Sequence, residues 1–141
     1  MPKKEKSMNR QEVFQEVKRI FGLVPDWIKS LPDEVVGDVW DIMKKVQLSS
    51  DTAIPPKYKE LIGLAVAATL RCRYCAYFHT EAAKFNGATE EELKEALMMS
   101  SLINLFSTYL NGSQYDLEKF KKETTEMLQH ARRKAPAGTK R

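Results

Sequence analysis

Apolar residues recur at helical spacing along nearly the whole sequence, whereas alternating runs rich in β-branched residues are almost absent. Apolar positions three and four residues apart lie on one face of an α-helix, and strict alternation is the pattern of a half-buried strand. The sequence therefore predicts an all-α fold. The expected helices cover residues 10–21, 33–46, 57–70, about 71–85, 90–110 and 116–134.

The length and charge of the chain limit its organisation and its partners. At 141 residues it suits one domain with a substantial buried core. The formal net charge of +4 lies at the ends, because residues 1–6 carry +2 and residues 132–141 carry +5. Phosphate binding favours basic clusters on a folded surface, so no nucleic-acid partner is expected. We predict a disordered basic N-terminus over residues 1–9, a single helical domain over 10–134 and a disordered tail over 135–141.

The longest apolar run, LIGLAVAATL at residues 61–70, is far shorter than the roughly 18 residues that a membrane span needs. We therefore expect a cytoplasmic protein with no membrane association. The helix over residues 57–70 is apolar almost all round, and Gly63 and several alanines allow its backbone to approach neighbours closely. Such a helix lies at the centre of a fold or at a subunit interface, which predicts a homo-oligomer.

The motif Cys-x-x-Cys-x-x-x-His contains the only two cysteines of the chain, Cys72 and Cys75, followed by His79. Two cysteines in one such motif indicate redox or metal chemistry rather than a secreted disulfide scaffold. At about 100° per residue the three side chains share one face of a helix, with His79 four residues after Cys75. The imidazole can then take the proton of the Cys75 thiol, and Cys72 can close a disulfide with an oxidised Cys75.

A metal site is an alternative for the same residues. Cys72, Cys75 and His79 supply three of the four ligands of a zinc site, and Glu60 or His130 is a candidate for the fourth. A buried cysteine pair that only packs is a further alternative.

A general base needs a partner that orients its second ring nitrogen, and Glu60 is our candidate. In one straight helix Glu60 would lie about 28 Å from His79, at 1.5 Å per residue. If the chain instead reverses near Leu70, the two residues become level on antiparallel helices, because they stand at nearly equal distances from the corner. No glycine or proline marks this corner, and Thr69 is its candidate N-cap.

The stretch from Glu60 through Cys72, Cys75 and His79, continued by FNGATEEELKEAL, resembles the alkylhydroperoxidase AhpD-like branch of the carboxymuconolactone decarboxylase family. The segments FGLVPDW and SLPDE are also similar to small members of that family, and the likeness covers roughly residues 14–112. The resemblance implies a compact helical bundle in which an antiparallel hairpin carries Glu60 and the cysteine motif. It also implies assembly into trimers or hexamers.

The resemblance further implies thiol-dependent reduction of a hydroperoxide or a disulfide, with no bound cofactor or metal. Glu60 and His79 would form a proton relay to Cys75, the reacting sulfur, and Cys72 would resolve the oxidised form. An external dithiol, protein-borne or lipoyl-like, would regenerate the enzyme. The peroxidases of the family carry a histidine directly before the second cysteine, where this chain has Tyr74. Tyrosine titrates near pH 10 and carries protons poorly at neutral pH, which favours dithiol redox activity over peroxidase activity.

Two other functions stay open from the sequence. One is a metal-binding or non-catalytic helical oligomer that serves as a scaffold. The other is an enzyme that resembles the lactone decarboxylases of the family, although these generally lack the cysteine pair.

Overall fold

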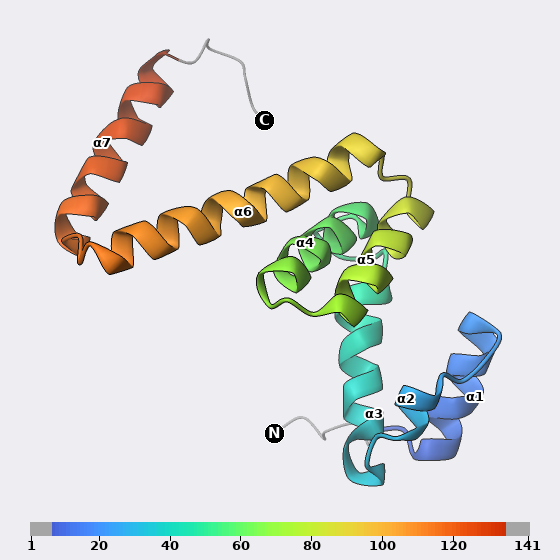
Figure 1. Ribbon diagram of the computed structural model, residues 1–141. Coiled ribbons are helices and arrows are strands. Elements are labelled where there is room, and N and C mark those ends of the chain that lie inside the picture. Colours follow the sequence, from blue (N-terminus) through green and yellow to red (C-terminus); the bar gives the residue numbers. More distant parts are fainter. Residues whose placement is uncertain (1–6, 135–141) are drawn as a thin grey trace, which may run out of the picture. The chain divides into compact units, whose positions relative to one another are not determined.

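The computed structural model describes residues 7–134, and every regular element in that range is helical, which confirms the predicted all-α fold (Figure 1). The chain divides into two compact units, Met1–Leu97 and Met98–Arg141. No helix within the described range combines the length and apolar character required to cross a bilayer. The elements are α1 (Arg10–Phe21), α2 (Asp26–Lys29), α3 (Asp33–Ile42), the π-helix η1 (Met43–Leu48), α4 (Pro56–Thr69), α5 (Arg73–Phe85), α6 (Glu90–Gly112) and α7 (Leu117–Lys134).

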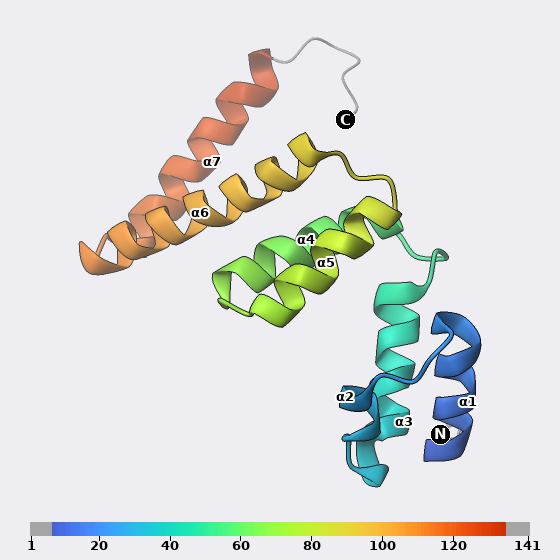
Figure 2. The same ribbon diagram turned by 45° about the vertical axis from the view of Figure 1, so that its right-hand side comes forward.

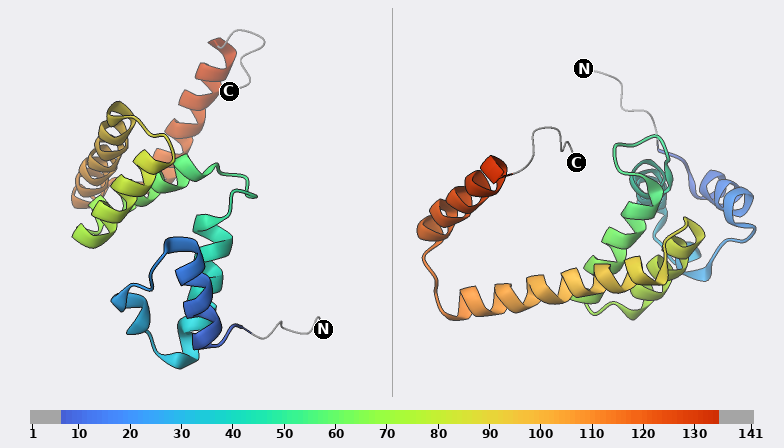
Figure 3. Two further views of the ribbon diagram at one scale, coloured as in Figure 1. Left: turned by 90° about the vertical axis from the view of Figure 1, so that its right-hand side faces the viewer. Right: turned by 90° about the horizontal axis from the view of Figure 1, so that it is seen from above.

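The first helix, α1, is delimited by local signals in the sequence. The Asn9 side chain accepts hydrogen bonds from the backbone N–H groups of Gln11 and Glu12, and the Asn9 N–H donates to the Glu12 carboxylate at 2.8 Å. This is a capping box. Gly22 ends the helix, as expected, in the left-handed conformation with φ 80°. α1 lies beside α3 (Figures 2 and 3), and with α2 they bury an N-terminal core made of Val13, Val17, Ile28, Val36 and Trp40.

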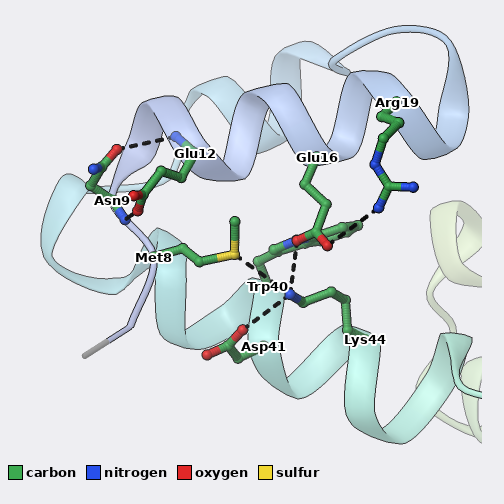
Figure 4. Close-up of polar contacts among 8 residues, drawn as sticks. All are labelled: Met8, Asn9, Glu12, Glu16, Arg19, Trp40, Asp41 and Lys44. Atoms are coloured by element: carbon green, nitrogen blue, oxygen red, sulfur yellow. Dashed lines mark hydrogen bonds and ion pairs between the residues drawn. The ribbon is translucent and has the colours of Figure 1, made fainter. Parts of the chain in front are cut away.

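A polar network links α1 to α3 and η1 at the edge of this core (Figure 4). Glu16 Oε2 accepts hydrogen bonds from the Trp40 indole at 2.7 Å and from the Lys44 ammonium at 2.8 Å. Lys44 also pairs with Asp41 at 3.4 Å, and Arg19 lies 3.6 Å from the second carboxylate oxygen of Glu16. The hydrogen bond with Lys44, followed by that with Trp40, lowers the pKa of Glu16 below its ordinary value.

The ends of the chain, which we predicted to be disordered, lie mostly outside the described residues. Two residues of the predicted N-terminal segment 1–9 make specific contacts, because Asn9 caps α1 and Met8 packs against the N-terminal core. Gly37 permits this approach, since a Cβ there would lie 3.2 Å from the carbonyl carbon of Met8. Specific contacts are thus present two residues before the predicted domain boundary.

The predicted helix over residues 33–46 differs from the observed one at its C-terminal end. α3 gives way to a π-helix, in which backbone bonds join residues five apart, as between the Ser49 N–H and the Lys44 carbonyl at 2.9 Å. The wider turn rotates each later side chain about the helix axis, away from the position that it would have in a continuous α-helix. Leu48 therefore packs against the N-terminal core, and Gln47 contacts Glu60 of α4.

The next two helices, α4 and α5, lie antiparallel and side by side (Figures 1 and 2). Together with the start of α6 they bury a second core, made of Leu64, Ala83 and Leu93. Thr89 and Glu92 form the predicted capping box at the start of α6, with reciprocal hydrogen bonds of 2.8 and 3.1 Å. These signals explain where α6 begins.

The second unit contains the remainder of α6 and the whole of α7. Between the two helices Gln114 adopts the left-handed conformation with φ 52°, and the Tyr115 hydroxyl donates to Glu123 at 2.7 Å. Large apolar side chains are exposed along this part of α6, namely Leu102, Ile103, Leu105, Phe106 and Tyr109.

We predict that Glu16→Gln lowers the free energy of unfolding at pH 7 by about 1 kcal/mol, the value of a partly exposed charged hydrogen bond. Because the pKa of Glu16 is lowered in the folded protein, its stabilisation is present above the ordinary value of 4.5 and is lost as the pH falls below it. The difference between variant and wild type should therefore shrink toward pH 3. Urea titration followed by the fluorescence of Trp27 and Trp40 measures it.

Glu118→Gln is the control for this prediction, because Glu118 forms an exposed pair with Lys121 on α7. Exposed ion pairs contribute little to stability, so this variant should unfold as the wild type does at every pH. A Glu16→Gln effect that stays constant between pH 7 and pH 3 would contradict the electrostatic explanation.

Candidate active site

Glu60 of α4 and His79 of α5 are in direct contact, with 2.6 Å between Glu60 Oε2 and His79 Nδ1. Glu60 is only 4% exposed, which is unusual for a carboxylate and is tolerated when the charge is paired. An ionised carboxylate offers only acceptor atoms, so an ionised Glu60 pairs with the tautomer of neutral His79 that carries its proton on Nδ1 and leaves Nε2 as an acceptor. The two side chains meet across the hairpin, as their nearly equal distances in sequence from the corner predicted.

The corner between α4 and α5 has the hydrogen bonds of a Schellman motif, without a glycine. The Cys72 N–H donates to the Ala67 carbonyl at 3.0 Å, and the Arg71 N–H donates to the Ala68 carbonyl at 3.1 Å. Arg71 takes the left-handed position with φ 55°, which side chains other than glycine adopt at a cost of roughly 1–2 kcal/mol. This ending reverses the chain within three residues and brings the two helices into register.

The N-cap of α5 is Cys72, and our assignment of Thr69 to that role is wrong. The Cys72 Sγ accepts a hydrogen bond from the Cys75 N–H at 3.2 Å. Thr69 lies in the last turn of α4, where its hydroxyl donates to the Ala65 carbonyl at 3.2 Å. Both cysteines therefore stand in the first turn of α5, where the positive end of the helix dipole favours thiolate over thiol.

The two cysteines form a disulfide with their Cα atoms 5.4 Å apart. Cys75 is exposed and Cys72 is half-buried. This difference makes Cys75 the more accessible sulfur of the pair.

Two cavities of the first unit open onto Cys75. One has a volume of about 430 Å³ and is largely aliphatic, with walls that include Ile54, Ile62, Val66 and Leu70. The other has a volume of about 630 Å³ and is walled mainly by Trp27, Met43, Tyr74 and Phe78. Three residues line both cavities, namely Gln47, Cys75 and His79. A molecule in either cavity thus reaches the exposed sulfur and the imidazole together.

The imidazole of His79 is held between α4 and its own helix. On one side it lies against Gly63, where a Cβ would approach Nε2 to 2.7 Å and would also overlap Nδ1. Phe78 also makes an edge-on contact with the ring, with 5.4 Å between ring centroids. Because residue 63 is a glycine, α4 can approach α5 closely enough to fix the position of the His79 ring.

Gln47 belongs to this site, and sequence reasoning missed it. Its Nε2 lies 3.3 Å from Oε1 and 3.4 Å from Oε2 of Glu60. A signal was present, because Gln47 continues the helical stripe of Val36, Trp40 and Met43 as a polar residue on an otherwise apolar face. We did not consider that polar position.

The alternative of a metal site has no ligand cluster to support it in residues 7–134. No group of three or more His, Cys, Asp and Glu side chains in that range is placed to hold an ion. Glu60 is instead paired with His79, and the two sulfurs are bonded to each other.

We predict that Gly63→Ala impairs the site more than it impairs the fold. Alanine favours a helix interior over glycine by about 1 kcal/mol, which offsets part of the overlap with the His79 ring. The displaced ring loses its contact with Glu60, so alkylation of reduced Cys75 at pH 7 should slow by about tenfold while circular dichroism stays helical. Gly112→Ala is the control, because a Cβ there meets nothing within 4 Å. Equal alkylation rates in both variants would contradict the prediction.

This chain is similar in structure or in sequence to known proteins. A crystal structure of the alkylhydroperoxidase AhpD core from Rhodospirillum rubrum is similar, with a TM-score of 0.69 and 27% sequence identity, over 78% of this chain and 84% of that one. A protein of Paracoccus denitrificans described as "Uncharacterized protein 4 in cox locus" is 28% identical over 79 residues, which are 56% of this chain and 70% of that protein. Residues 35–115, more than half of the chain, match the carboxymuconolactone decarboxylase family. The chain belongs to the carboxymuconolactone decarboxylase family and has an AhpD-like fold.

Proposed function

We propose that the protein is a thiol-dependent oxidoreductase that reduces a hydroperoxide or a disulfide with the Cys72/Cys75 pair. The observation that carries the proposal is the buried contact of 2.6 Å between Glu60 and His79, whose ring lines both cavities together with Cys75. A carboxylate that orients an imidazole beside a thiol is the arrangement that activates a sulfur nucleophile. The similarity to an alkylhydroperoxidase core supports the same class of reaction.

The roles of the two sulfurs follow from their exposure. Cys75 is the more exposed residue of the pair and lines both cavities, which supports a role for it as the residue that meets the substrate. Cys72 is half-buried at the N-cap and can reach Cys75, as the disulfide between them demonstrates. Cys75 is therefore assigned as the attacking thiolate and Cys72 as the resolving one.

The proposed cycle begins when His79 takes the proton of Cys75. The thiolate attacks one peroxide oxygen, the O–O bond breaks, and the departing alkoxide takes the proton back from the imidazolium and leaves as an alcohol. Cys75 is then a sulfenic acid. The Cys72 sulfur attacks it, hydroxide leaves and combines with the Cys72 proton to form water, and the disulfide closes. Two thiols are oxidised by two electrons, and the hydroperoxide is reduced to an alcohol and water.

Regeneration requires a reductant, for which we propose an external dithiol, either protein-borne or lipoyl-like. Its thiolate attacks the Cys72–Cys75 disulfide, and exchange through a mixed disulfide returns both cysteines to the reduced state. A cytoplasmic location is part of the proposal, because dithiol reductants of this kind keep that compartment reducing. A small disulfide entering the same cavities would be reduced by the reverse exchange, in which Cys75 attacks first.

Mass spectrometry of the reduced protein after brief exposure to an organic hydroperoxide tests this function. The wild type should lose two hydrogen atoms as the disulfide forms. Cys72→Ser should instead gain one oxygen atom at Cys75, because the sulfenic acid has no resolving thiol. Cys75→Ser is the matched variant and should stay unmodified over the same time. Sulfenic acid at Cys72 in that variant, formed at the rate of the Cys72→Ser reaction, would refute the assigned roles.

We also propose that the chain forms a homo-oligomer, as a trimer or a hexamer. Support comes from a stripe of exposed apolar side chains at four-residue spacing, formed by Tyr58, Ile62 and Val66 of α4 and by its C-cap Leu70, which is 71% exposed. Exposed apolar stripes of this kind mark interaction surfaces, since isolated soluble proteins seldom keep them in water. The exposed apolar residues of α6 add a second such surface.

Light scattering of the purified protein should therefore give a mass of three or six chains at micromolar concentration. Phe106→Glu, which places a charge among the apolar residues of α6, should shift the population toward smaller species. Thr108→Glu, on the polar side of the same helix, should leave the mass unchanged. A wild-type protein that is monomeric at this concentration would overturn the proposal.

A further inference from the structure

We propose that Gln47 is a positioning residue, which holds the Glu60 carboxylate aimed at Nδ1 of His79. This inference rests on the proposed thiol chemistry and adds a residue to it. The observation behind it is that the Gln47 amide nitrogen lies at nearly the same distance from both carboxylate oxygens, 3.3 and 3.4 Å.

The sequence places Gln47 there by means of the π-helix. In a continuous α-helix, spacings of four, three and four residues would put Gln47 on the face of Val36, Trp40 and Met43, against the N-terminal core. The bond between the Ser49 N–H and the Lys44 carbonyl widens the turn instead. Leu48 packs against that core, and Gln47 is freed to contact Glu60. Single π turns inside helices frequently occur at functional sites.

The chemistry of the contact suits a positioning role. An amide donor stabilises the charged form of a carboxylate, because hydrogen bonding to the ionised state favours it. It does so without adding a cation that would compete with the imidazolium for Glu60. The nearest lysine in the sequence, Lys59, lines the aliphatic cavity but donates its ammonium to the Ser49 carbonyl at 2.8 Å.

The orientation of the carboxylate is also constrained. A single nitrogen bonded to both oxygens limits rotation of the carboxylate, and Oε2 keeps a lone pair directed at His79. Gly63 and Phe78 also contact the His79 ring. Gln47 therefore supplies the constraint on Glu60 that Gly63 and Phe78 supply on the imidazole.

The test measures alkylation of Cys75 by iodoacetamide in reduced Cys72→Ser protein, where serine keeps the helix capped and only one thiol can react. Adding Gln47→Met, which has similar length but no amide, should slow the reaction at pH 7 by about fivefold to tenfold, the effect expected of one lost hydrogen bond. At pH 10 the thiol ionises without a base, so the rates should converge. Gln47→Glu should be slower still at pH 7, because a second carboxylate faces Glu60.

Three further variants make the result specific. Lys45→Met, an exposed change on the same π-helix, should react as the parent does. Glu60→Gln should be slow at pH 7, and the double variant Gln47→Met/Glu60→Gln should be no slower than Glu60→Gln alone, since Gln47 acts through Glu60. A slow Glu60→Gln with a normal Gln47→Met would overturn the role of Gln47 and leave the proposed function intact. Normal rates in both variants would overturn the relay itself.

A spectroscopic measurement separates positioning from a general loss of structure. The chain has only two histidines, so ring ¹⁵N resonances are simple to assign, and exposed His130 serves as an internal reference. His79 should carry its proton on Nδ1 in the parent protein, and Gln47→Met should introduce the tautomer protonated on Nε2. An unchanged tautomer, or slowing of alkylation by the same factor at pH 7 and pH 10, would refute the proposal.

Discussion

The contact between Glu60 and His79 is the interaction on which the rest of this structure depends. It joins a buried carboxylate to an imidazole across two helices, and a buried charge is stable only if such partners are in place. Each neighbouring feature serves that condition. The glycine-free corner at Arg71 sets the register of the helices, and Gly63 leaves room for the ring. Gln47 completes the hydrogen bonding of the carboxylate.

The N-terminal helices contribute to the site through Trp27 of α2, which walls one cavity, and through η1. The core of α1, α2 and α3 fixes one end of this segment, where Lys44 is bound to Glu16 and Leu48 is packed against apolar side chains. Gln47 lies between these two anchored residues and faces the opposite way, toward α4. The polar network around Glu16 is therefore connected to the candidate active site by a few residues of backbone.

Those parts of the structure that follow from local rules could be predicted from the sequence. The all-α class followed from apolar periodicity, and Gly22 and the Thr89–Glu92 pair marked helix ends. Glu60 and His79 stand at nearly equal distances in sequence from the corner, which predicted that they would lie level on the two helices. The roles that we assign to Cys72, Cys75, His79 and Glu60 stay predictions, because geometry alone measures no reaction. The family match covers residues 35–115 and supports the class of protein rather than these roles.

The features that the sequence did not reveal arise from competition between local and tertiary preferences. An arginine in a left-handed corner has no local signal, because packing of α4 on α5 compensates for its strain. The change from α- to π-helix depends on Leu48 and Gln47 finding partners in different parts of the fold. Serine, threonine, aspartate and asparagine dominate N-caps, so Thr69 was a reasonable choice and Cys72 was overlooked.

The position of Cys72 has a consequence for chemical damage. Its sulfur anchors the opening turn of α5 by accepting the Cys75 amide hydrogen. Cys75, which forms the sulfenic acid in the proposed cycle, lies in the same turn, and its overoxidation to a sulfonate would add a permanent negative charge at the helix terminus, where anions are stabilised. Such damage would thus change the charge of the site while the opening turn of α5 stays formed.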